Sequence, residues 1–530
     1  MREHDKERVL VEVVQRVFEE YNRDPRTVEQ ALFDTIYEER RRLETEKDRT
    51  QARRQTALYD QEYHEALHAP FARQRELLKR IIQAFAEEVA GHFDPRIYAL
   101  ATRAIPPALT ITLNAMSPLR LLGILPGGLG SLHDQVEVEG EIEAFKAVAK
   151  LGTTVLVATH SSHMDSILLG YMLYRIGLPP FTYGAGLNLF HNKMLGFFMH
   201  NLGAYKVDRR KKAIVYKEVL KTYAGCTLEL GYDNMFFPGG TRSRSGAVEK
   251  KLKLGLLGMG LDAYIHNLMA GKEKPDIFVV PCTINYQLVL EAETLIDDYL
   301  KEVGKSRYII EDDEFSKPRR VLDFVSKLFS LNSRIHMVIS RPVDVFGNTV
   351  DTEGRSQDQR GRFVDRRKYV FRDGRPHFDA QRDQEYTREL ARAITDAFHR
   401  DTLINSTHLI SHAVFGWLRD HNPDLDLYRL LRSGGARESL PLPEAYERVE
   451  RTRETLSRLD QQGRLRLDDT VKRKDPVAVV SEALAYLKSY HRTPAVTRSG
   501  DRLQHRDRNL LFYYQNRLDG FGLPMMEKPQ

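Results

Sequence analysis

The stretch Val155-Leu-Val-Ala-Thr-His-Ser-Ser-His-Met-Asp165 sets a histidine, His160, five residues before a carboxylate, Asp165. A carboxylate beside an imidazole fixes the ring tautomer and stabilises the imidazolium that forms when the ring takes up a proton. No Ser or Cys nucleophile elbow accompanies the pair, so we expect His160 to activate a substrate hydroxyl directly. The spacing alone is a weak signal, because Asp165 is equally suited to capping a helix N-terminus.

The flanking residues predict the elements that position this pair. Thr153–Ala158 is an apolar run that predicts a buried strand, and Asp165–Ile176 is amphipathic and predicts a helix. We therefore expect His160 in the loop that joins the strand to the helix, with Asp165 in the first turn of that helix.

A second feature lies further along, at Met235-Phe-Phe-Pro-Gly-Gly-Thr-Arg-Ser-Arg-Ser-Gly246. Glycine amides can close around an oxyanion, and Arg242 and Arg244 can donate charge-assisted, bidentate hydrogen bonds to a phosphate. The GxxxxGK[ST] spacing of a P-loop is absent. The alternative interpretation is a surface turn with solvated arginines.

A basic segment, Leu202-Gly-Ala-Tyr-Lys-Val-Asp-Arg-Arg-Lys-Lys212, lies between these two features. From Lys206 to Lys253 there are twelve Lys or Arg and five Asp or Glu, an excess of seven, whereas the whole chain carries a net charge of +6. Charge runs are often only solvated faces, but this one favours a phosphorylated or anionic partner. Beyond it, Ile277–Tyr286 predicts a buried strand broken by Pro281.

In this order and spacing, the segments resemble the four sequence blocks of the glycerolipid acyltransferases. The blocks are His-x4-Asp, Gly-Ala-Tyr-x3-Arg, Phe-Pro-Gly-Gly-Thr-Arg-Ser-Arg-Ser-Gly and Val-Val-Pro. The likeness is greater to the glycerol-3-phosphate and dihydroxyacetone-phosphate acyltransferase branch. Asn509-Leu-Leu-Phe-Tyr-Tyr-Gln-Asn-Arg517 is similar to a Leu-Leu-x-Tyr-Tyr-x-Asn block near the end of such enzymes, so the likeness extends, with gaps, from Phe93 to Leu518.

The resemblance implies that His160 is the general base and Asp165 its partner. It implies that Pro281 shapes the back of the site. It also implies that the phosphate of the acceptor is bound by residues of the second and third blocks, namely Lys206, Arg209, Arg210, Gly240, Thr241, Arg242, Ser243 and Arg244. The chain departs from the family pattern at two positions. Gly239 stands where a glutamate is usual, and Asp208 stands where an arginine is expected.

The implied reaction transfers a fatty acyl group from an acyl thioester to the hydroxyl of glycerol 3-phosphate, the first step of phospholipid synthesis, without an acyl-enzyme. The thioester is acyl-coenzyme A or acyl carrier protein, and no metal or other cofactor is expected because no HExxH motif or Cys cluster occurs. The two departures leave other acceptors open, namely dihydroxyacetone phosphate, a lysophospholipid or another alcohol. An inert membrane-associated scaffold is the remaining alternative. Nucleic acid is not expected, because aromatic residues do not interleave with the basic stretch.

The composition and the hydrophobic pattern predict where in the cell the protein works. The chain of 530 residues has two cysteines, Cys226 and Cys282, which make no disulfide framework and favour a reducing cytoplasm. The first residues show no signal pattern, and no apolar run is long enough to span a bilayer. We expect a peripheral protein on the cytoplasmic face of the membrane. Ile105–Gly130 and Leu187–Tyr205 are either interfacial segments or core.

The alternation of apolar and amphipathic segments predicts an α/β fold, in which a mixed sheet is flanked by helices and helical regions lie at both ends. We expect an N-terminal helical region at 1–97, an acyltransferase α/β domain at 98–345, a linker and hairpin at 346–383, and a C-terminal helical region at 384–530. Phe346–Arg367 is polar and predicts a linker or long loop, and Asp373-Gly374 predicts the turn of the hairpin.

Overall fold

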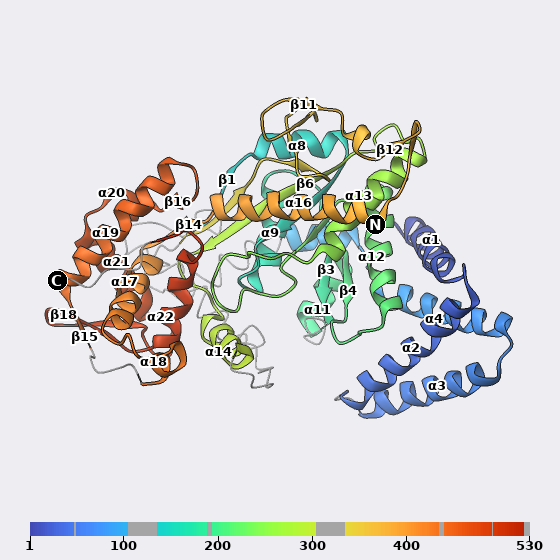
Figure 1. The fold of residues 1–530 in the computed structure, drawn as a ribbon, viewed down its shortest axis with the longest axis horizontal. Coiled ribbons are helices and arrows are strands. Elements are labelled where there is room, and N and C mark those ends of the chain that lie inside the picture. The colour runs from blue at the N-terminus through green and yellow to red at the C-terminus, as the bar shows by residue number, and fades with distance from the viewer. Residues whose placement is uncertain are drawn as a thin grey trace.

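The computed structural model describes residues 1–46, 49–103, 135–187, 193–303, 334–433, 439–489 and 491–523. A central sheet lies between the N-terminal helices on one side and a group of C-terminal helices on the other (Figure 1). The predicted α/β fold, with its mixed sheet and a helical region at each end, is confirmed. The domain boundaries stay predictions.

The N-terminal helices pack through one apolar face each. They are α1 (Glu3–Tyr21), α2 (Pro25–Glu44), α3 (Arg49–His68) and α4 (Phe71–Val89). Helix α4 buries Leu78, Ile82, Phe85 and Val89, which recur every three or four residues and so share one face. These side chains belong to the same apolar core as α12 (Ile214–Glu229), which joins the N-terminal region to the sheet.

The described part of the chain contains one large mixed sheet. Its strands are β1 (Val136–Gly140), β2 (Thr153–Ala158), β3 (Thr182–Gly186), β4 (Ala204–Val207), β5 (Asn234–Phe236), β6 (Ile277–Tyr286), β7 (Ile335–Ile339), β8 (Val343–Asp344), β9 (Thr349–Val350), β10 (Ser356–Gln357) and β11 (Phe363–Val364). The order β8-β6-β2-β5-β3-β4 contains the central strands, and β7 pairs with both β6 and β1. Strands β2 to β6 pair in parallel, whereas β6 pairs antiparallel with β7 and β8.

Each face of the sheet contributes to a different apolar core. Strand β2 is buried along its whole length, as expected for a central strand covered on both faces. Its Leu156 and Ala158 join one core and its Val155 and Val157 join the other, because successive side chains point to opposite faces. The first core is shared with α8 (Ile142–Leu151) and α9 (Met164–Arg175), and the second with α12, α13 (Leu254–Met269) and α16 (Ala380–Arg400).

The C-terminal region is mainly helical and packs against the part of the sheet that contains β1, β7 and the end of β6. Its elements are α17 (Ser406–Asp420), α18 (Leu427–Ser433), α19 (Leu442–Gln461), α20 (Asp469–Arg473), α21 (Pro476–Ser489), α22 (Arg508–Gln515) and η3 (Asn516–Leu518), with short strands β14 (Leu403–Ile404), β15 (Ser439–Pro441), β16 (Arg466–Leu467), β17 (Val496–Ser499) and β18 (Arg502–His505). The last helix, α22, packs against α17 and α14 (Ala292–Val303). The end of the chain is thereby brought next to the sheet.

Two expectations for the sheet differ from the structure. The strand expected to break at Pro281 is continuous, and Pro281 pairs with Val157 of β2. Proline is tolerated there because its missing N–H falls where the antiparallel partner passes from β7 to β8.

The segment expected to be a linker, Phe346–Arg367, instead forms β9, β10 and β11 at the edge of the sheet. Its polar residues make the turns, since the carboxylates of Asp351 and Asp358 each accept two backbone N–H groups. The predicted hairpin is present as β12 (Phe371–Arg372) and β13 (Arg375–Pro376), with Asp373 and Gly374 both at positive φ in its turn.

No helix among the described residues is long and apolar enough to cross a membrane. Of the two segments considered for interfacial insertion, Ile105–Gly130 lies outside the described residues. Residues 188–192 of the second segment do as well. Its remainder forms α11 (Lys193–Asn201) and β4.

Candidate active site

The structure brings His160 and Asp165 into direct contact. Strand β2 ends at Ala158 and α9 begins at Met164, so the two residues lie in and just after the connecting turn. His160 Nδ1 is 2.8 Å from Asp165 Oδ2, and both side chains are buried. With the proton on Nδ1 donated to the carboxylate, Nε2 carries the lone pair that can accept a proton from a substrate.

The Asp165 carboxylate is itself tightly held. Its Oδ2 also accepts the backbone N–H groups of Ser161 at 2.7 Å and Ser162 at 2.9 Å, and the hydroxyl of Tyr286 donates to its Oδ1. Asp165 therefore binds the backbone of the base loop and orients the imidazole at the same time, whereas the N-cap residue of α9 is His163, which makes no side-chain cap hydrogen bond.

Packing around the imidazole favours its neutral form. The His160 ring stacks on Phe237, with ring centroids 3.9 Å apart and planes 14° from parallel. Burial lowers the pKa of His160 below its ordinary value, the Asp165 carboxylate opposes this, and the positive charge of Arg242 adds to the lowering. A buried imidazole that is neutral at physiological pH is suited to act as a base.

Glu291, a residue that sequence reasoning missed, connects the base loop to Arg242. Its side chain is fully buried, its Oε2 accepts the hydroxyl of Ser162 at 2.8 Å, and its Oε1 accepts the N–H of His163 at 3.0 Å. Arg242 Nη1 lies 3.4 Å from the same Oε1. Burial raises the pKa of Glu291 and the charge of Arg242 opposes the shift. One buried carboxylate thus fixes both the loop and the guanidinium.

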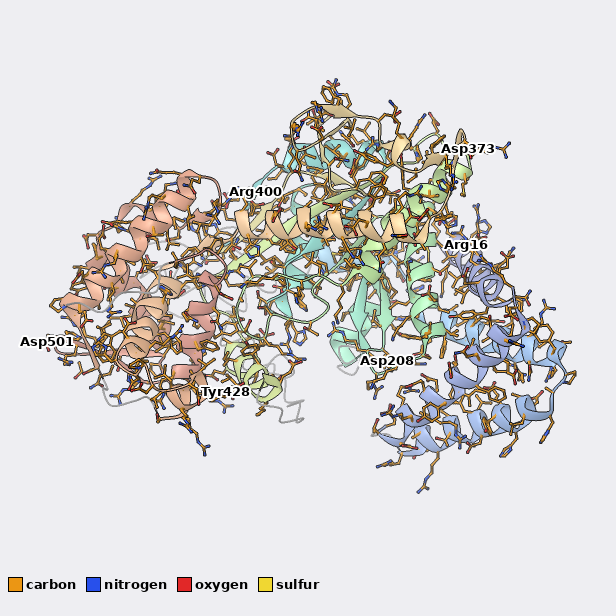
Figure 2. The ribbon with its side chains drawn as sticks, in the orientation of Figure 1. Arg16, Asp208, Asp373, Arg400, Tyr428 and Asp501 are labelled. Atoms are coloured by element: carbon orange, nitrogen blue, oxygen red, sulfur yellow. The ribbon has the colours of Figure 1, made fainter. Side chains whose placement is uncertain are left out.

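The second block ends in a turn that separates its basic residues. Asp208 is buried, and its carboxylate accepts the backbone N–H and Nε of Arg210. Arg210 also donates to Glu46 at 2.9 Å, and Lys211 donates to Glu88 at 2.7 Å. Asp208 lies at the end of the sheet on the side of the N-terminal helices (Figure 2). Arg210 and Lys211 are therefore paired with carboxylates, and Glu46 and Glu88 come from the N-terminal region.

The pKa of Arg209 shifts in the opposite direction from that of Arg210, which its carboxylate partners raise. The Arg209 side chain is exposed, and desolvation by the surrounding protein together with the charges of Arg242 and Arg244 lowers its pKa. Three guanidinium groups from the second and third blocks are therefore close enough to repel one another. Lys206 precedes them on β4 and is half-buried. Clustered cations of this kind are relieved by binding an anion.

The third block forms a turn beside the base loop. Gly240 has φ of +78°, and its N–H donates to the carbonyl of Phe237 at 3.0 Å, so this amide closes the turn and does not point to a ligand. Thr241 follows in the same turn, and Ser243 donates its N–H to the His160 carbonyl at 2.6 Å. Arg244 Nη1 pairs with Glu302 at 2.5 Å. The arginine side chains carry the positive charge of this turn, and the Gly240 amide is used inside it.

Two further parts of the chain lie close to the site. Pro281 is in β6, where it pairs with Val157 of β2, three residues before His160. From the C-terminal block, Asn516 donates to the Ser245 carbonyl at 2.9 Å, and the buried Arg517 donates to Asn285 Oδ1 at 3.0 Å. No sequence spacing could have indicated these contacts, because they join residues more than 200 positions apart.

The part of the chain that carries the base loop and the arginine-bearing turns is similar in sequence to known proteins. Residues 136–285 match a family model described as Acyltransferase. A glycerol-3-phosphate acyltransferase of Actinobacillus succinogenes is 33% identical over 189 residues, which are 35% of this chain and 22% of that protein. A glycerol-3-phosphate acyltransferase of Pseudomonas syringae pv. tomato is 29% identical over 210 residues, which are 37% of this chain and 24% of that protein. The matched part is thus less than a quarter of the length of these curated relatives.

Among solved structures, the 1-acyl-sn-glycerophosphate acyltransferase PlsC from Thermotoga maritima is similar to this chain, with 15% sequence identity. The similarity covers 55% of this chain and 96% of that one, with a TM-score of 0.25.

Proposed function

We propose, because residues 136–285 belong to the acyltransferase family, that this protein transfers a fatty acyl group from an acyl thioester to the hydroxyl of glycerol 3-phosphate. The observation that carries the proposal is the buried His160–Asp165 pair, with Nδ1 and Oδ2 2.8 Å apart, beside a cluster of arginines. A general base next to a site for an anion suits an acceptor that carries both a hydroxyl and a phosphate.

The base removes the proton of the acceptor hydroxyl as the oxygen attacks the thioester carbonyl. A new C–O bond forms, the C–S bond breaks, and the leaving thiolate takes the proton from the His160 imidazolium. Asp165 stabilises the imidazolium in between, and general base catalysis of this kind contributes about 10²–10⁴-fold. No group of the protein becomes acylated in this sequence.

The side chains near the base support direct transfer. Ser162 donates its hydroxyl to Glu291, which holds that oxygen within the protein. Both thiols are buried, and burial raises the pKa of Cys226 to about 12 and raises the pKa of Cys282 as well. A thiol with a raised pKa supplies little thiolate, so neither cysteine is suited to be a nucleophile.

We assign the phosphate of the acceptor to Arg209 and Arg242, with Arg244, Lys206, Thr241 and Ser243 at the border of the same site. A phosphate held here is bound through atoms that do not react, which converts a bimolecular encounter into a positioned one. A dianion also reduces the mutual repulsion of the guanidinium groups.

We further propose that the protein works without a metal or other cofactor, as a peripheral protein on the cytoplasmic face of the membrane. Helix α9, which follows the base loop, exposes Ile167 and Tyr174, and α11 exposes Phe197. Apolar side chains of this kind beside basic residues suit contact with an anionic lipid surface. The product, a lysophospholipid, would enter that surface.

The proposal is tested by incubating the purified protein with a labelled acyl thioester and a panel of acceptors. Acyl-coenzyme A and acyl carrier protein are compared as donors, and glycerol 3-phosphate, dihydroxyacetone phosphate, a lysophospholipid and glycerol as acceptors, with products identified by mass spectrometry. We expect an ester of glycerol 3-phosphate that does not form with the His160→Ala variant. A preference for another acceptor would reassign the substrate, and no ester with any acceptor would refute the proposal.

A further inference from the structure

We infer that Glu249 is a positioning residue for the base, and that its side chain occupies the space that the absent side chain of Gly239 leaves open. The inference rests on the proposed function, since it assigns Glu249 a part in the acyl transfer by His160. Glu249 lies in the segment between β5 and α13, far from His160 in sequence.

Glu249 holds the backbone of His160 directly. Its Oε1 accepts the N–H of His160 at 2.9 Å, while the carbonyl of His160 accepts the N–H of Ser243 at 2.6 Å. Both backbone polar groups of the base are therefore bound to the segment that follows β5. The side chain is bound separately, through Nδ1 to Asp165. Removing one of the two backbone contacts frees the histidine to shift relative to Phe237 and the acceptor.

The small size of Gly239 makes room for this contact. A Cβ atom at Gly239 would lie 3.2 Å from Glu249 Cγ and 3.7 Å from its Oε1. Gly240 needs glycine for its positive φ, but Gly239 is not among the residues with positive φ, so its backbone could accept a side chain. The closest atom to such a side chain is Glu249 Cγ, and Glu249 would have to shift by a few tenths of an ångström to accommodate it.

The environment of Glu249 is consistent with a role inside the protein and not at the substrate. Its Oε2 is buried and accepts no hydrogen bond from the described residues. Burial raises the pKa of Glu249, and the hydrogen bond from His160 and the charge of Arg517 oppose the shift. A carboxylate without solvent access on one oxygen is poorly placed to exchange protons with a substrate, so we assign it to positioning.

The decisive experiment is a double-mutant cycle of Glu249→Ala and Gly239→Ala, with kcat and KM for glycerol 3-phosphate measured in each variant. A misplaced base lowers kcat, and we expect about a 10²-fold loss for Glu249→Ala with little change in KM. Glu249→Gln keeps an oxygen acceptor and should retain most of the activity. Gly239→Ala displaces Glu249 and should lower kcat a few-fold alone, with no further loss in the Glu249→Ala background.

A matched control and an activity-independent measurement complete the test. Gly170→Ala, in α9, adds a Cβ that would meet nothing within 4 Å, and it should leave kcat unchanged. The rate at which diethyl pyrocarbonate modifies His160, followed by mass spectrometry, should rise in Glu249→Ala and Gly239→Ala but not in Glu249→Gln.

The outcomes separate the two proposals. Additive losses of kcat from Gly239→Ala and Glu249→Ala, or an unchanged modification rate in Glu249→Ala with its melting temperature preserved, would overturn the role of Glu249. If the wild-type protein acylates no acceptor, the proposed function fails, while the modification rates still report whether Glu249 holds the His160 loop.

Discussion

The base loop and the arginine-bearing turns meet at one site, but they are stabilised in opposite ways. In the base loop, polar groups satisfy one another inside the protein, and Asp165 alone accepts from His160, Ser161, Ser162 and Tyr286. On the cationic side like charges gather: desolvation lowers the pKa of Arg209, and the charges of Arg242 and Arg244 lower it further. The base is organised before any ligand binds, whereas the cationic side keeps a mutual repulsion that a bound anion would reduce.

The largest effect should come from the base itself. His160→Ala removes the proton acceptor and should lower kcat by about 10²–10⁴-fold or more, with the melting temperature nearly unchanged. His163→Ala is the matched control, because the His163 ring lies in the same loop, with its centroid 6.5 Å from that of the His160 ring, and the backbone N–H that it donates to Glu291 is kept in the variant. Similar losses in both variants, or retained turnover in His160→Ala, would contradict the assignment of the base.

On the cationic side, substitution should affect binding of the acceptor more than chemistry. Arg209→Gln and Arg242→Gln each remove a charge-assisted hydrogen bond to phosphate, and we expect KM for glycerol 3-phosphate to rise about 10- to 10²-fold. Arg244→Gln should have a smaller effect, because Arg244 is paired with Glu302. Steady-state kinetics with the acceptor and the thioester varied in turn would measure this.

The contrast between the two regions predicts the pattern across these variants. The KM for the thioester should change less than the KM for the acceptor in all three arginine variants. Equal changes in the two KM values would show that the arginines do not bind the phosphate of the acceptor. The contrast between the two regions would then have no functional meaning.

The same contrast separates what the sequence could predict from what it could not. Strand β2, strand β6 and helix α9 carry local patterns, and the predicted Thr153–Ala158 and Ile277–Tyr286 match the strands in the structure. The predicted helix Asp165–Ile176 differs from α9 by one residue at each end. His160 and Asp165 are close in the chain, so their contact follows from one turn.

Contacts between distant segments left no such signal. Glu291 and Glu249 reach the base loop from beyond β6 and β5, and Arg517 comes from the end of the chain. The basic run at 209–212 gave no indication that Arg210 and Lys211 pair with carboxylates, because Glu46 and Glu88 belong to α2–α4 and their flanks. Only the packing of the N-terminal helices against the sheet determines that Arg210 and Lys211 pair with these carboxylates.

A pH profile couples the two regions. The base must be neutral to act, so activity is present above the pKa of His160 and falls as the pH drops through it. Burial is the main cause of the lowered pKa of His160, and the charge of Arg242 adds to the lowering. Arg242→Gln should therefore raise the pKa of His160 and move the acid limb of kcat/KM to higher pH, as measured from pH 5 to 8.

Arg209→Gln serves as the comparison for this shift. The acceptor phosphate titrates identically with Arg209→Gln and with Arg242→Gln, so its contribution cancels when their pH profiles are compared. Arg209 is not among the charges that lower the pKa of His160, and its substitution should leave the acid limb closer to that of the wild type. Acid limbs that coincide in the wild type and Arg242→Gln would show that the cationic side does not act on the base.

The smallest effect should come from Asp208, which connects the cationic side to the N-terminal helices. Its carboxylate accepts the N–H and the Nε of Arg210, and Arg42 Nη1 of α2 lies 4.0 Å away. Asp208→Asn keeps one acceptor oxygen but removes the charge that balances these guanidinium groups. The turn that presents Arg209 should loosen, and KM for glycerol 3-phosphate should rise a few-fold while kcat stays unchanged.

Asp358→Asn is the control for this change, since Asp358 accepts the N–H groups of Arg360 and Arg362 in a similar turn at the β10–β11 edge of the sheet. We expect no change in KM there. A fall in kcat without a rise in KM for Asp208→Asn would mean that the turn acts on the base loop. The two regions would then be one structural unit. The charge of Asp208 would be needed to keep His160 in place as well as to present Arg209.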